Sequence, residues 1–150
     1  MKFGAKLACV VLCALFVGGS CGCGKAVPES PYQSVGDVIL ALKEAGLPVT
    51  NEIVYQEETD VTPAYRQKGD FSDSRLEPRY TPNPDNGTVE IFSSPEKMRE
   101  RAEEQVGYRF LSGYGYQIKT GIVLVQLDKQ FTKEQAEGYA EALEADLTVL

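Results

Sequence analysis

The alternation of apolar and polar residues predicts that a folded domain opens with a helix near position 34. Ser34 and Asp37 are spaced as a capping box, and the apolar residues after them recur on one helical face until Gly46 and Pro48 end the helix. Residues 49–55 then alternate in the manner of a strand. The domain is therefore predicted to begin with a helix followed by a strand.

The second half of the chain continues this pattern and predicts three strands and two helices. Ser94 and Pro95 form one helix start, and Thr132 with Gln135 forms a second capping box. The predicted elements are a strand at 88–92, a helix from Pro95 to about Leu111, strands 114–118 and 122–127 around a three-residue hairpin loop, and a helix after Thr132. Residues 34–150 are thus predicted to be a single α+β domain, with a mostly antiparallel sheet of about four strands, three helices on one face, and the order α-β-long loop-β-α-β-β-α.

Residues 56–87, between the first two predicted strands, are predicted to be a long loop. This stretch has 32 residues, among them four prolines and seven acids. A loop of this length is uncommon in a compact domain unless it is functional or disordered. Its aromatic residues Tyr65, Phe71 and Tyr80 lead us to expect that part of it packs across the domain.

The first 23 residues have the proportions of a secretory signal. Lys2 and Lys6 precede an unbroken run of eleven apolar residues, 7–17, which is shorter than the roughly 18 residues that span a bilayer. Small residues follow it and lead directly into Cys21. The alternatives are an ordinary signal cut near Ser20, which leaves a secreted protein, and an uncleaved anchor.

The segment Val17-Gly18-Gly19-Ser20-Cys21 resembles the signal of bacterial lipoproteins. The resemblance implies that residues 1–20 are removed and that Cys21 receives a diacylglyceryl group, with Cys23 as the alternative acceptor. Residues 21–33 would then be the lipidated cysteine and a tether. Two acyl chains suffice for stable attachment without a spanning helix, so the protein is expected to be extracytoplasmic and held on the cell membrane by an N-terminal lipid.

The exported part also resembles a set of small bacterial lipoproteins to which no activity is attached. The matching residues are Ala45-Gly46-Leu47-Pro48, Asp60, the segment 66–69, Phe71, Asp73, Thr132, Gln135, Ala136 and Tyr139. These motifs are short, and they imply membership of an envelope lipoprotein group rather than a reaction.

Charge and composition narrow the classes of function. The chain has no histidine, and all four cysteines lie in the first 23 residues, so the domain lacks a Ser-His or Cys-His nucleophile pair and a thiolate metal site. From Cys21 onward there are 13 basic and 22 acidic residues, a net charge of −9. Such a surface is repelled by nucleic acid, so the expected partners are the membrane, through the lipid, and another envelope protein or glycan.

A possible binding surface combines residues of the long loop with two tyrosines of the strand at 114–118. Tyr114 and Tyr116 alternate with glycines, so both are expected on one face of that strand; tyrosine is a frequent interface anchor. The other interpretation makes these tyrosines core residues beneath the loop. The candidate surface comprises Tyr65, Arg66, Asp70, Phe71, Asp73, Tyr80, Tyr114 and Tyr116.

The acids of the loop allow two weaker interpretations. Asp60, Asp70 and Asp73 are candidate calcium ligands, but the pattern lacks the spacing of an EF-hand, and a solvated acidic loop is favoured. A carboxylate pair is also the familiar hydrolytic chemistry open to a chain without histidine, although Ser94-x-x-Lys97 is more simply a helix cap. No metal and no other cofactor is predicted.

The sequence therefore favours a non-enzymatic binding or accessory module of the cell envelope. The alternative is a small carboxylate-dependent hydrolase that acts on cell-wall or glycan material. A second alternative is a module stabilised by calcium.

Overall fold

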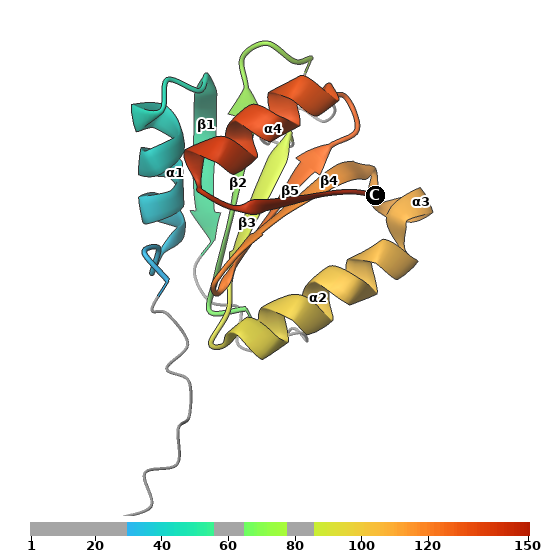
Figure 1. Ribbon diagram of the computed structural model, residues 1–150. Helices are drawn as coiled ribbons and strands as arrows, with labels where there is room; N and C mark the ends of the chain where they lie inside the picture. The colour runs from blue at the N-terminus through green and yellow to red at the C-terminus, as the bar shows by residue number, and fades with distance from the viewer. Residues whose placement is uncertain (1–29, 56–64, 78–85) are drawn as a thin grey trace, which may run out of the picture.

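The computed structural model describes residues 30–55, 65–77 and 86–150 (Figure 1). Over these residues the chain forms one sheet and four helices. The elements are α1 (Val35–Glu44), β1 (Val49–Tyr55), β2 (Gln67–Asp73), β3 (Gly87–Ile91), α2 (Pro95–Gly107), α3 (Arg109–Ser112), β4 (Tyr114–Thr120), β5 (Val123–Asp128), α4 (Lys133–Ala142) and β6 (Asp146–Val149). Asp60 and Tyr80 lie outside the described residues.

The strands of this region form a single antiparallel sheet in the order β1-β2-β3-β5-β4-β6. The predicted α+β class is confirmed, but six strands and four helices replace the predicted four and three. The missed strands are β2, inside the segment predicted to be a loop, and the short β6 at the end of the chain. β2 contains no β-branched residue, so its strand conformation comes from pairing with β1 and β3 rather than from local propensity.

Local capping explains why α1 and α4 were predicted well. The Ser34 hydroxyl accepts from the Asp37 amide at 3.1 Å, and the Asp37 carboxylate accepts from the Ser34 amide at 2.9 Å. Thr132 and Gln135 make the same reciprocal pair at the start of α4. Because each box satisfies two amides that the first turn leaves unpaired, both helix starts are fixed by residues adjacent in sequence.

The helix predicted to run from Pro95 to about Leu111 is instead divided. α2 ends at Gly107, Tyr108 separates it from the four-residue α3, and Phe110 is 86% exposed rather than on a core face. The hairpin turn between β4 and β5 also holds two residues, not three.

Helices cover both faces of the sheet, which corrects the expectation that they would share one. α1 and α4 pack on the face that carries Phe71, Val89 and Val125, and this side holds the larger apolar core. α2 packs on the opposite face with Met98 and Ala102, against Phe92 and Leu124. The figure shows α1 and α4 on one side of the strands and α2 on the other (Figure 1).

The centre of the larger core is an aromatic cluster that joins β2 to α4. The rings of Phe71 and Tyr139 stack with centroids 5.8 Å apart, and Phe131 meets Tyr139 edge to face at 5.4 Å. Phe71 also lies over Gly87, its partner on β3, where an added Cβ would come within 2.1 Å of the ring. Phe71 therefore belongs to the core and not to a binding surface.

A β-bulge at Gly115 separates the two tyrosines of β4. Tyr114 pairs with Asp128 and Tyr116 with Leu127, so one extra residue stands on β4 between these pairs. Opposed residues share a face, and Asp128 and Leu127 point to opposite sides of β5. Tyr114 and Tyr116 consequently lie on opposite faces, and the prediction that they share one was wrong.

In the described part of the chain, no helix combines the length and apolar character needed to cross a bilayer.

Substituting Gly87 by Ala should lower the free energy of unfolding by about 2–3 kcal/mol, because the new Cβ has to displace the buried ring of Phe71. Urea unfolding measures the change. Gly107→Ala is the matched control, since its Cβ meets nothing within 4 Å and the effect there should stay within about 1 kcal/mol. Equal stability losses in the two variants would contradict the packing described for Phe71.

Candidate functional site

A row of polar residues crosses the sheet on the face that α2 covers. The strand register places these residues directly opposite one another on five strands; in order across the sheet they are Asp70, Thr88, Gln126, Gln117 and Thr148. Directly opposed side chains in an antiparallel sheet lie about 5 Å apart at Cβ. Thr88, Gln126 and Gln117 are buried, so their polar atoms need partners inside the protein or from a bound molecule.

The end of the row at β2 is satisfied by hydroxyl groups. The Tyr55 hydroxyl donates to Asp70 Oδ2 at 2.8 Å, and Thr88 Oγ1 donates to Asp70 Oδ1 at 2.7 Å. Because the one hydroxyl proton of Thr88 goes to Asp70, the Tyr114 hydroxyl 2.9 Å away is the donor to Thr88. Burial and the hydrogen bond to the Asp70 carboxylate raise the pKa of Tyr55 to about 12.

A buried ion pair lies beside the row and fixes α2 on the sheet. Arg101 Nε donates to Glu90 Oε2 at 3.3 Å, and Arg101 Nη2 donates to Glu90 Oε1 at 3.3 Å. The Glu90 side chain is fully buried. Burial acts to lower the pKa of Arg101, but the neighbouring Glu90 carboxylate outweighs it and the pKa is raised. Gln126 Nε2 donates to the same carboxylate at 3.4 Å.

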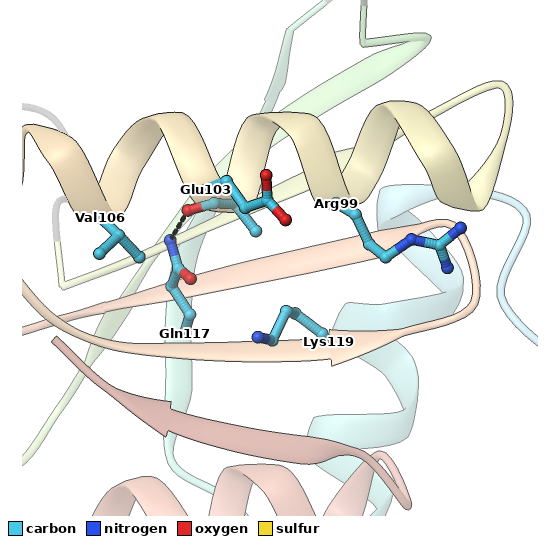
Figure 2. A pocket seen from close by; sticks show the side chains of 6 residues that line it. Arg99, Glu103, Val106, Gln117 and Lys119 are labelled. Atoms are coloured by element: carbon cyan, nitrogen blue, oxygen red, sulfur yellow. Dashed lines mark hydrogen bonds between the residues drawn. The ribbon is translucent and has the colours of Figure 1, made fainter.

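At Gln117, next to its other end, the row adjoins a pocket of about 150 Å³ between α2 and β4 (Figure 2). Gln117 lies at its base, and its Nε2 donates to the backbone oxygen of Ala102 at 3.0 Å. The Oε1 atoms of Gln117 and of the neighbouring Gln126 are buried and find no hydrogen-bond partner among the described residues. The remaining wall consists of Arg99, Glu103 and Val106 from α2 and Lys119 from β4.

The charged groups of this pocket have distinct placements in Figure 2. Lys119, two residues after Gln117 on the same side of β4, turns its ammonium toward Gln117. The Glu103 carboxylate lies across from it on α2, and the Arg99 guanidinium extends away from Gln117. Arg99 also pairs with Glu96 at 3.1 Å on the exposed side of the helix. The pocket wall therefore carries one carboxylate, that of Glu103, and two cations, of which Lys119 lies nearer to Gln117 than Arg99 does.

A second polar cluster lies on the opposite face and belongs to the core. The buried Asp73 carboxylate accepts from Arg75 Nε at 3.0 Å, from Arg75 Nη2 at 2.6 Å and from the Tyr139 hydroxyl at 2.9 Å. Burial alone would raise the pKa of Asp73, but these hydrogen bonds outweigh it and the pKa lies below its usual value. Burial and the Asp73 carboxylate likewise raise the pKa of Tyr139. The hydrogen-bonding groups of Asp73, Arg75 and Tyr139 therefore satisfy one another inside the protein.

The sequence-predicted binding surface is therefore divided between the two sheet faces and the exterior. Asp70 and Tyr114 belong to the polar row, and Tyr65 packs against the smaller core beneath α2. Phe71 and Asp73 are buried on the other face, with Tyr116 packed against the core there. Arg66 is exposed.

The two candidate calcium ligands that the structure describes do not come together either. Asp70 and Asp73 are three positions apart on one strand, so their side chains point to opposite faces. Among the described residues, no three acids or other metal-binding side chains form a group that could hold an ion.

Sequence reasoning missed the residues that form the pocket. A glutamine in the middle of an otherwise apolar strand was the available signal, because Gln126 stands inside Val-Leu-Val-Gln-Leu and Gln117 between Tyr116 and Ile118. A buried amide costs stability unless it is hydrogen-bonded, so its position within a core strand indicates a polar site.

Comparison with protein-family models, with curated proteins and with solved structures finds no match for this chain. What can be defined is an α+β domain with a six-stranded antiparallel sheet in its described part and a polar pocket beneath one helix.

Asp73→Asn should give a stability loss that depends on pH. The lowered pKa of Asp73 means that its carboxylate stabilises the fold above the pKa of an unfolded aspartate, about 3.9, and that this contribution is lost as the pH falls through the folded value. The variant should be about 2 kcal/mol less stable than the wild type at pH 7, and the difference should shrink below about pH 4. Urea unfolding at pH 7, 4 and 3 measures it. A difference that stays constant with pH would count against the charge interaction.

Proposed function

We propose that this protein is a lipid-anchored, extracytoplasmic binding module that holds a small ligand in the pocket between α2 and β4. The observation that carries the proposal is the Oε1 atom of Gln117, a buried acceptor at the base of that pocket without a partner among the described residues. Leaving such an atom unpaired costs about 1–3 kcal/mol, so a donor from a bound molecule is favoured there.

The state of the carboxylates supports binding rather than catalysis. Asp70 accepts from two hydroxyls, Glu90 is paired with Arg101, and Asp73 is paired with Arg75. A general acid or base has to reach a substrate proton, whereas these carboxylates are occupied by neighbouring side chains of the fold. The hydrolase alternative has no comparable observation in its favour.

The position of the tether supports attachment close to the membrane. Ser30 lies against Gly121 in the β4–β5 turn. α2 begins at the same end of the sheet, because the Phe92 amide, just before α2, donates to the backbone oxygen of Ile122 in that turn. Cys21 stands nine positions before Ser30 in the sequence. A chain of that length extends at most about 30 Å, so lipid at Cys21 would keep the domain within that distance of the bilayer.

Cells grown with radiolabelled palmitate test the anchor. Wild-type protein and the Cys23→Ala variant should both incorporate label, and Cys21→Ala should lose it, because Cys21 is the proposed acceptor. Retention of label in Cys21→Ala but not in Cys23→Ala would move the lipid to the alternative cysteine. Unlabelled wild type, or equal label in the double variant, would end the anchoring proposal.

In-cell photocrosslinking tests the pocket. A photoreactive residue in place of Val106, which lines the pocket and is 39% exposed, should give an adduct whose mass is read by intact-protein mass spectrometry. A photoreactive residue in place of Glu137, exposed on α4 at the other face, is the matched control. Identical adduct patterns at the two positions would exclude specific binding in the pocket.

A further inference from the structure

We propose that the ligand of this pocket is a small zwitterion with an ammonium and a carboxylate on adjoining carbons, that is, a free α-amino acid with a small side chain. This inference rests on the proposed function and specifies the ligand of the same site. Its three supports are the acceptor at the base, the opposite charges at the rim and the size of the space.

The base of the pocket requires a hydrogen-bond donor. Gln117 is held in one amide orientation because its Nε2 donates to Ala102 O at 3.0 Å, so Oε1 is the amide atom left buried without a partner among the described residues. Gln126, directly opposite on β5, also has a buried Oε1 without a partner in the described part of the chain. An ammonium brings three N–H donors and suits the unpaired acceptor of Gln117, the one of these two glutamines that lines the pocket.

The rim supplies a charge for each end of a zwitterion. The Glu103 carboxylate on α2 stands across the pocket from the Lys119 ammonium on β4. Glu103 and Gln117 together can receive a ligand ammonium, and Lys119 can receive the carboxylate beside it. A simple amine would leave Lys119 unmatched, and a simple carboxylic acid would leave Glu103 and Gln117 unmatched.

The space limits the size and polarity of the ligand. The volume of about 150 Å³ is about ten times the space that one water molecule needs, so a molecule of several heavy atoms fits. Ala102 and Val106 line the same space with methyl groups. These features fit a short aliphatic side chain.

The experiment compares three probes on the full mature chain in detergent. L-alanine carries both charges, N-acetyl-L-alanine lacks the ammonium, and L-alaninamide lacks the carboxylate. L-alanine should raise the melting temperature in a concentration-dependent way and give a saturable calorimetric signal. The other two probes should bind at least tenfold more weakly, since each leaves one rim charge and its partner unmatched.

Variants at the rim identify the site without disturbing the core. Glu103→Gln and Lys119→Gln should each weaken L-alanine binding about tenfold and leave the melting temperature of the free protein unchanged. Glu100→Gln, on α2 but outside the pocket, is the matched control and should bind as the wild type does. Gln117→Leu should abolish binding; because Gln117 is buried and this variant can also lose stability, the rim variants are decisive.

The outcomes separate this inference from the proposed function. Equal binding of L-alanine and N-acetyl-L-alanine, or equal binding by Glu103→Gln and wild type, overturns the zwitterion. No binding of any of the three probes also overturns it, and it assigns the Gln117 acceptor to water or to another ligand. In that case a specific adduct from position 106 would preserve the proposed binding function, and its absence would remove both.

Discussion

The contact of the Phe71 ring with Gly87 and Tyr139 is the constraint on which the rest of the structure depends. It joins β2 to β3 through a glycine that leaves room for the ring, and it joins the sheet to α4 through the stack with Tyr139. The Tyr139 hydroxyl then donates to the buried Asp73, which also holds Arg75. Because this junction fixes β2 in the sheet, it also sets the register that places Asp70 opposite Thr88 at the start of the polar row.

The two sheet faces differ in the size of their apolar cores and in how fully their buried polar groups are hydrogen-bonded. The α1–α4 face carries a large apolar core in which the buried polar groups saturate one another. The α2 face has only a small apolar cluster, and its buried polar groups are saturated at the β2 end but not at Gln117 and Gln126. An unpaired buried acceptor lowers the stability of a fold. On the proposal above, a ligand that donates a hydrogen bond to this acceptor would remove that cost.

The sequence predicted the features that depend on neighbouring residues and missed those that depend on distant ones. The capping boxes at Ser34 and Thr132 set α1 and α4 correctly because both partners lie within three positions. β2 was predicted as a loop because it has a glycine, two aspartates and no β-branched residue, and only its neighbours make it a strand. Asp70 and Tyr114 were identified as candidates from their residue types. Gln117 and Gln126 were missed, because only the register of β4 and β5 brings their amides together.

α2 is attached to the sheet by fewer buried apolar side chains than α1. α2 buries only Met98 and Ala102, whereas α1 buries four apolar side chains in the larger core. The other contacts of α2 with the sheet include the Arg101–Glu90 ion pair beside the polar row and the hydrogen bond from Gln117 Nε2 to Ala102 O. On the proposal of a bound ligand, recognition beneath α2 therefore rests on matching polar groups, chiefly Gln117, Glu103 and Lys119, rather than on burying apolar area.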